Sequence, residues 1–255
     1  MKSQFTILFF VLTLVLSTTN CLHSASLLKV KDHSGPWVFV PSKWDVLGRA
    51  YFYAVLAGSS TTNTGATTVH GSIGVSPGTA ISGTAVTLIW GSLLGGDTFS
   101  LAAQGDLTKS YNFLAGLPSL PANNLTGQDL KGKILPPGVY KFDVAGGLTA
   151  GVLKLDANGD YNAQWIFQFG STFITEVGAQ VEMINGGNPM NVFWQVGSSA
   201  VIKNKGVMVG NIVAHTSITL AGETTLRGRA LARAGGVTMD RNVVNSSYYW
   251  PGWYN

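Results

Sequence analysis

The sequence predicts a mainly β protein, built as a parallel β-helix with one α-helix packed alongside. Charged residues make up only 11% of the 255 residues, against about 25% in a typical soluble protein, and 32 residues are glycine. Short strand-like segments of similar sequence recur along the chain, and a single stretch has helical periodicity. A chain with little charge and much Gly and Thr is typical of many short strands joined by tight turns.

The recurring segments define the repeat. They are VYKFD (139–143), WIFQF (165–169), VFWQV (192–196), NIVAH (211–215) and RALAR (229–233). Small residues follow each segment, and two further short strands follow these, as in 216–220 and 224–227. Because three short strands form each repeat, the pattern predicts a parallel β-helix. A β-sandwich is the alternative, and the triplets of strands disfavour it.

The first strands of the repeats are apolar on both sides. When the last four segments are stacked in register, two columns form: Ile166, Phe193, Ile212 and Ala230, and then Phe167, Trp194, Val213 and Leu231. Adjacent positions of a strand face opposite sides of its sheet, so this sheet is predicted to be buried on both faces. Its inner face would fill the solenoid, and its outer face needs a cover.

The predicted cover is a helix over residues 97–116. Its apolar positions, spaced by three or four residues, form one stripe: Phe99, Ala103, Leu107, Tyr111 and Leu114. Asp97 or Thr98 can cap the start of the helix, and Gly116 precedes Leu117 and Pro118 at its end.

The N-terminus has the pattern of a secretory signal peptide. Lys2 precedes the apolar run FTILFFVLTLVL (5–16), which is too short to span a membrane, although an uncleaved anchor is the alternative. We expect a signal peptide over residues 1–21, with cleavage between 21 and 26, and a single domain over 27–255. The mature chain would then be secreted, without Cys21, which is the only cysteine. Its glycosylation candidates are Asn124 and Asn245, each in an Asn-x-Ser/Thr sequon. We expect residues 27–49 to pack over one end of the fold.

The second strands of the repeats alternate between inward apolar residues and outward small polar ones. The outward candidates are Ser60, Thr62, Thr149, Ser217, Thr219, Thr238 and Asp240. Stacked strands lie about 4.7–4.9 Å apart, so such a face is flat and regular. Thr side chains are stiff, and their hydroxyl groups can hold ordered water at little further entropic cost. The alternative is that Thr simply favours exposed strand positions.

Several blocks of the sequence resemble a microbial ice-binding protein family found in bacteria, yeasts, fungi and polar algae. The blocks are AVLAGSSTTNTG (54–65), VHGSIGVSPGTA (69–80), LPPGVY (135–140), WIFQ (165–168), FWQ (193–195) and GRALA (228–232), in the expected order. The resemblance implies a right-handed, discontinuous β-helix of triangular section, with a long helix alongside. It also implies a non-enzymatic protein that adsorbs to ice and its ordered water, causes thermal hysteresis and inhibits recrystallisation. Thr238 and Asp240 best match positions on the ice-binding face of the family.

Other chemistry has little support in the sequence. A formal net charge of +4 is too modest for a nucleic-acid binder, and no Cys/His cluster, phosphate loop or nucleophile elbow occurs. We therefore expect no cofactor, metal, nucleic acid or membrane partner, and a monomer. The alternative function is an extracellular protein that binds or cleaves polysaccharide, for which Asp156 and Glu182, with Lys154 nearby, could meet on neighbouring coils. An adhesin is a third hypothesis, with Trp250 and Trp253 involved, although these residues could instead cap the solenoid.

Overall fold

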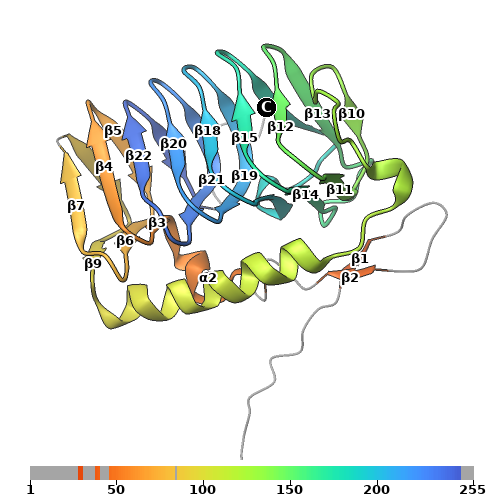
Figure 1. The fold of residues 1–255 in the computed structure, drawn as a ribbon. Helices are drawn as coiled ribbons and strands as arrows, with labels where there is room; N and C mark the ends of the chain where they lie inside the picture. The colour runs from red at the N-terminus through yellow and green to blue at the C-terminus, as the bar shows by residue number, and fades with distance from the viewer. Residues whose placement is uncertain (1–27, 31–37, 41–45, 84, 248–255) are drawn as a thin grey trace, which may run out of the picture.

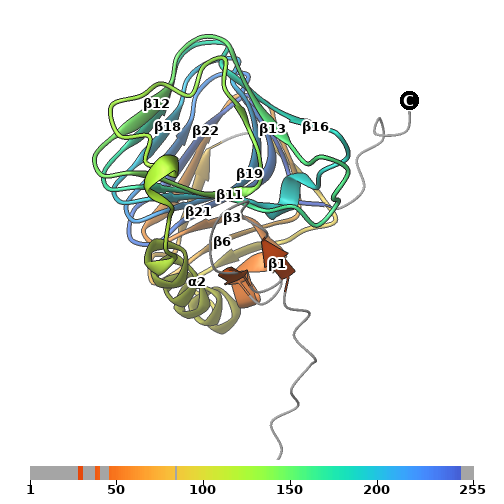
Figure 2. The same cartoon turned by 90° about the vertical axis from the view of Figure 1, so that its right-hand side faces the viewer.

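A computed structural model describes residues 28–30, 38–40, 46–83 and 85–247. The predicted signal peptide, Trp250 and Trp253 lie outside these residues. The described chain forms a solenoid with three walls of parallel strands and one long α-helix (Figure 1). Seen along its axis, the solenoid is triangular in section (Figure 2). The mainly β architecture and the single α-helix of substantial length therefore match the sequence-based prediction.

The wall next to the helix, called the helix-side wall, is one of the three. Its strands, in spatial order, are β11 (Gly138–Phe142), β14 (Trp165–Phe169), β17 (Val192–Val196), the second halves of β19 (Val207–Ala214) and β21 (Thr225–Ala232), β3 (Tyr53–Ala57), β6 (Ser72–Val75) and β9 (Leu93–Gly95).

A separate seven-stranded sheet forms the second wall. Its strands, in spatial order, are β12 (Gly146–Leu148), β15 (Phe173–Thr175), β18 (Ala200–Ile202), β20 (Ile218–Leu220), β22 (Val237–Asp240), β4 (Ser60–Thr64) and β7 (Ala80–Gly83).

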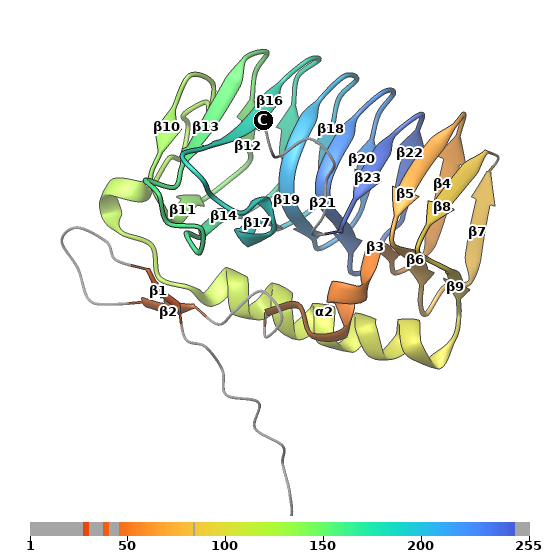
Figure 3. The same cartoon turned by 180° about the vertical axis from the view of Figure 1, so that it is seen from behind.

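The third wall is seen from outside in Figure 3. Its strands are β10 (Ile134–Leu135), β13 (Val152–Asp156), β16 (Gln180–Ile184), the first halves of β19 and β21, β23 (Val243–Asn245), β5 (Thr67–His70) and β8 (Val86–Ile89). Outside the solenoid, β1 (Leu28–Val30) pairs with β2 (Val38–Val40) in antiparallel fashion. The described residues also form three short 3-10 helices: η1 (Gly48–Phe52), η2 (Pro121–Asn123) and η3 (Pro189–Asn191).

The order of the coils in space differs from their order in the chain. The last C-terminal coil pairs with the first N-terminal one, because β21, β22 and β23 lie beside β3, β4 and β5. Helix α2 (Thr98–Gly116) then runs along the solenoid, so that the chain resumes at the opposite end in β10 and β11 (Figure 1). The β-helix is therefore discontinuous, as the family resemblance implied.

The predicted register is wrong by one residue between β17 and β19. Trp194 pairs with Ile212 rather than with Val213, while Phe193 pairs with Asn211. The Asn211 amide donates to the carbonyl oxygens of Met190 and Val192, at 3.0 and 3.2 Å, and this fixes the observed register. The predicted alignments between β14 and β17 and between β19 and β21 hold, whereas Val139 of the VYKFD segment pairs with Ile166 rather than with Trp165. Aromatic rings fill the interior, as where Phe167 stacks on Trp194 at 4.3 Å.

Two stacked glycines allow β19 and β21 to turn the corner between walls. Gly210 and Gly228 pair with each other and have φ of +101° and +157°. A Cβ on Gly228 would lie 1.8 Å from the Gly210 carbonyl oxygen, so no side chain fits there without moving the backbone.

We expect Gly228→Ala to lower the free energy of unfolding by about 3 kcal/mol, because the added methyl forces two coils apart. Urea unfolding measures this loss. Gly105→Ala on α2 is the matched control, since its Cβ would meet no atom within 4 Å. It should be neutral or stabilising by up to about 1 kcal/mol. Equal stability of the two variants would contradict the close approach at Gly228.

Helix α2 covers the helix-side wall, as predicted, although its buried stripe begins differently. Asp97 caps the helix by accepting a hydrogen bond from the Ser100 amide at 2.6 Å. Ala103, Leu107 and Leu114 are buried, but Phe99 is 72% exposed, contrary to the predicted stripe. The first turn instead buries Ser100, whose hydroxyl donates to the Leu94 carbonyl oxygen. A polar contact with the solenoid thus orients the start of the helix.

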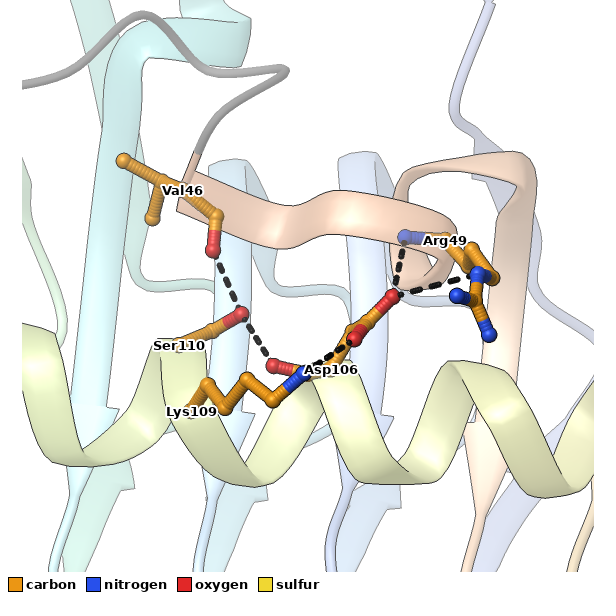
Figure 4. A network of polar contacts seen from close by, with 5 residues as sticks. All are labelled: Val46, Arg49, Asp106, Lys109 and Ser110. Carbon is orange, nitrogen blue, oxygen red and sulfur yellow. Dashed lines mark hydrogen bonds and ion pairs between the residues drawn. The ribbon is translucent and has the colours of Figure 1, made fainter. Parts of the chain in front are cut away.

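Residues 46–49 of the N-terminal arm lie along α2 and not over an end of the solenoid, which corrects the prediction for this part of the arm. Figure 4 shows the contacts that hold it. The Ser110 hydroxyl donates to the Val46 carbonyl oxygen at 2.5 Å. Asp106 accepts from the Arg49 amide at 3.2 Å and from Lys109 at 3.0 Å. The arm is therefore tied to the middle of the helix by polar contacts that sequence spacing does not reveal.

This network makes stability depend on pH. Burial raises the pKa of Asp106, but the hydrogen bonds from Lys109 and Arg49 outweigh it and hold the pKa below the ordinary 3.8. A carboxyl whose pKa is lower in the folded state stabilises the fold above pH 3.8, and this contribution is lost as the pH falls through the folded pKa.

We therefore expect Asp106→Asn to be less stable than the parent at neutral pH, with the two melting temperatures converging as the pH falls below about 4. Thermal unfolding followed by circular dichroism across this range measures the convergence. Melting curves that remain equally far apart at every pH would contradict the role of the Asp106 carboxylate.

Candidate functional site

The outer surface of the seven-stranded sheet carries one aligned column of side chains. Strand pairing places one central residue from each coil in this column, in the order Gly147, Ile174, Val201, Thr219, Thr238, Thr62 and Ser82. Neighbouring strands in a sheet lie about 4.7–4.9 Å apart, so the column repeats regularly along the solenoid axis.

Alternating burial explains why these residues point outward. On either side of Thr219, Ile218 and Leu220 are buried, and Val237 and Met239 are likewise buried beside Thr238. A shift of one residue would expose the apolar side chains and bury the hydroxyl groups, so the register is strongly specified.

Three threonines form an uninterrupted row across β20, β22 and β4. Thr219 pairs with Thr238, and Thr238 pairs with Thr62. The Thr62 hydroxyl donates to the Thr238 hydroxyl at 3.2 Å, which limits the rotation of both side chains. The row offers methyl groups and hydroxyl groups at fixed positions, an arrangement suited to ordering water and without any group for acid–base chemistry.

All seven residues that the sequence analysis singled out belong to this sheet or directly adjoin it. Six of them lie on the adjacent coils of β20, β22 and β4, and Thr149 lies apart from these. Ser60, Ser217 and Asp240 flank the threonine row on the same coils. Thr149 follows β12, and the coils of β15 and β18 separate it from Thr219. Asp240 forms an ion pair with Arg241 at 3.2 Å, which places a charged pair at the rim.

Sequence reasoning missed Ser82, which continues the row beyond Thr62. The alternation of Ala80, Ile81 and Ser82, 20 residues after Ser60 to Thr62, was the available signal. The opposite half of the column is apolar, with Ile174 and Val201 exposed or half-exposed.

That apolar half is bordered by charge. Lys203 donates to both carboxylate oxygens of Glu176, each at 2.8 Å. These two side chains follow β18 and β15 directly. Asp240 holds the equivalent position two residues after Thr238, so charge borders both halves of the column. The half on β20, β22, β4 and β7 is distinguished by its hydroxyl groups.

The carboxylates considered for catalysis lie on the neighbouring strands β13 and β16, two residues out of register with each other. Asp156 pairs with Ile184 in the third wall, whereas Glu182 pairs with Lys154. Asp156 accepts a hydrogen bond from Asn185 at 2.7 Å, and this bond lowers its pKa. Among the described residues, no group of three or more His, Cys, Asp or Glu side chains could hold a metal ion. Nor does any helix there have the length and apolarity needed to cross a membrane.

The two glycosylation candidates differ in exposure. Asn124 is exposed beside η2. Asn245 in β23 is 2% exposed, and its side-chain oxygen accepts from the Ser247 amide at 2.8 Å.

Comparison with known proteins gives the family of the chain. Residues 55–245 match the ice-binding-like family. An ice-binding protein of Nostoc sp. (strain HG1) is 44% identical over 205 residues, which cover 80% of this chain and 75% of that protein.

Solved structures of ice-binding proteins share the fold. The crystal structure of one from an Antarctic biological consortium has a TM-score of 0.73 and 38% identity, covering 77% of this chain and 88% of that one. Another, from the Antarctic ascomycete Antarctomyces psychrotrophicus, has a TM-score of 0.75 and 33% identity, covering 80% and 98%. With its discontinuous β-helix and family match over residues 55–245, the chain belongs to the ice-binding-like family.

Proposed function

We propose that the protein adsorbs to ice through the seven-stranded sheet, with Thr62, Thr219 and Thr238 at the centre of the contact. The observation that carries the proposal is the row of threonines in register on a rigid, regular wall. The row is uncharged, so it imposes no ionic hydration shell on the water between protein and ice. Ser60, Ser217 and Asp240 form the rim, and Thr149 takes no central part because two coils separate it from the row.

Adsorption of this kind explains an effect on ice growth without any catalysed reaction. An ice front held at adsorbed molecules can advance only as curved patches between them, and curvature lowers the temperature at which the patches grow. The freezing point therefore falls below the melting point, which is thermal hysteresis. The same pinning slows recrystallisation. Fixed side chains help because ordering water on them costs little additional entropy, at most about 2 kcal/mol for each immobilised water.

The test is the growth of single ice crystals in a nanolitre osmometer with the purified mature chain. We expect a gap between the melting and freezing points, faceted crystals and slow coarsening of polycrystalline ice. A heat-denatured sample is the control, and it should give round crystals without a gap. Round crystals and no gap from the folded protein would overturn the proposal.

We further propose that residues 1–21 direct secretion and are removed, with cleavage between 21 and 26. The exposed Asn124 would then be the glycan acceptor, because the Asn245 side chain is buried. Mass spectrometry of the protein secreted from a eukaryotic host tests both points. An intact N-terminus, or a glycan on Asn245, would contradict them.

A further inference from the structure

The two ends of the solenoid differ in whether a segment of the chain covers their last strands. At one end, residues 121–135 cover the coil that contains β11, β12 and β13. The backbone of Asn124 forms an isolated parallel β-bridge with Lys141, and that of Asp129 forms one with Gly147. In addition, β10 pairs with β13. This cap carries the charges of Asp129, Lys131 and Lys133.

The opposite end is open (Figures 1 and 3). Within the described part of the chain, β7 pairs only with β4, β8 only with β5, and β9 only with β6. Each wall therefore ends in a strand with one unpaired edge. The backbone N–H and C=O groups along that edge have no strand partner.

The side chains at this open end are uncharged and partly apolar. From Gly78 to Gly96 the sequence contains no charged residue and no proline. Trp90 is 84% exposed and Leu93 is 54% exposed. Proteins usually protect an exposed strand edge with charge, proline, a bulge or a covering segment, because an open edge is a template for pairing. The capped end has such protection, and the end formed by β7, β8 and β9 does not.

We propose that a second copy of this chain docks on the open end, so that two solenoids meet end to end about a two-fold axis. The partner must supply three strand edges in a triangle, and another copy of the same end does so. If the axis passes through β7, then β7 lies antiparallel to its own copy, and β8 lies opposite β9 of the other chain. The cap at the far end prevents further addition, so association stops at a closed dimer.

The charge distribution favours this partner. A two-fold axis brings a surface against its own copy, so charges near the axis, or a net charge of one sign on the surface, would repel. The whole chain carries a formal charge of +4, yet the segment 78–96 carries none. The open end can therefore meet itself without like-charge repulsion. A dimer differs from the monomer that the sequence analysis predicted. The sequence alone could not show that one end of the solenoid is open.

Analytical ultracentrifugation of the mature chain and its Trp90→Lys variant tests the inference. We expect the parent to sediment at twice the chain mass and the variant at the single-chain mass at the same concentration, since two lysines would face each other. Trp90 has a φ of +54°, and Lys205 and Arg241 adopt φ of +59° and +48°, so long basic side chains tolerate this backbone. Leu93→Lys is a second variant with the same expected result.

The matched control is Ile134→Lys, which places the same charge on a 61% exposed residue of the capped end. It should remain a dimer. Circular dichroism and thermal melting establish that each variant is folded before it is compared. A parent that sediments as a single chain at every concentration overturns the inference, and so does a dimer that survives in folded Trp90→Lys and Leu93→Lys.

Discussion

Replacing Thr238 with tyrosine should remove most of the thermal hysteresis and leave the fold intact. Thr238 is exposed at the centre of the threonine row, between Thr219 and Thr62. A phenol at this position projects from a flat surface and holds the neighbouring hydroxyl groups away from an ice plane. The fold should tolerate it because the side chain points outward and the adjacent Val237 and Met239 keep their buried places. Osmometry at matched concentrations measures the loss.

Thr225→Tyr is the matched control for Thr238→Tyr. Thr225 is a half-exposed threonine on β21 in the third wall, where it pairs with Val243. Its variant should retain the activity of the parent, whereas Thr219→Tyr should lose activity as Thr238→Tyr does. If the Thr238 and Thr219 variants both shape ice like the parent, the assignment of the face is wrong.

Replacing Arg229 with methionine should cause a loss of stability at least as large as that expected for Gly228→Ala. Arg229 is 1% exposed and lies where the C-terminal coils meet the N-terminal ones. It donates to the carbonyl oxygens of Tyr51 at 2.8 Å and Ser246 at 3.2 Å, and to the Asn211 side-chain oxygen at 3.0 Å. Its guanidinium also lies 4.0 Å above the centre of the Tyr51 ring. One side chain thus joins three distant parts of the chain.

Methionine fills similar space but leaves three acceptors without their donor. Burial lowers the pKa of Arg229 to about 10, so the group remains charged at neutral pH and its hydrogen bonds are charge-assisted. We expect a loss of about 3–5 kcal/mol in the free energy of unfolding, and a fall in melting temperature of roughly 10 °C. Arg229→Lys should also be destabilised, because an ammonium group cannot reproduce the planar geometry of the three bonds.

Urea unfolding measures these losses, and Arg241→Met is the control. Arg241 is exposed and forms an ion pair with Asp240, an interaction that contributes less than about 1 kcal/mol. A loss in Arg229→Met no larger than that in Arg241→Met would mean that Arg229 does not hold the junction.

The sequence was sufficient to predict the elements that follow from periodicity. Helix α2 has a capping Asp97 and a repeating apolar stripe, and its predicted bounds of 97–116 agree with the structure to within a residue. The threonine row was also predictable, since inward apolar residues alternate with Thr219 and Thr238, and the repeat spacing stacks them.

Other features depend on contacts between residues far apart in the chain. The register at Asn211 is set by its amide bonds to Met190 and Val192, which no apolar pattern records. Phe99 fits a helical stripe by spacing, yet the solenoid binds Ser100 instead. Arg229 lies between Gly228 and Ala230 in β21, and its acceptors come from segments before and after it in the sequence. These features follow from tertiary structure, so propensity and spacing could not reveal them.

The most direct test of the account measures how much of each protein variant is incorporated into slowly growing ice. Parent, Thr238→Tyr and Thr225→Tyr would be labelled with a fluorophore and mixed with a similarly sized labelled protein that does not bind ice. The account predicts that the parent and Thr225→Tyr enter the ice, while Thr238→Tyr stays in the liquid with the inert protein. Incorporation of Thr238→Tyr together with exclusion of Thr225→Tyr would contradict it, and would place the ice-binding surface on the third wall.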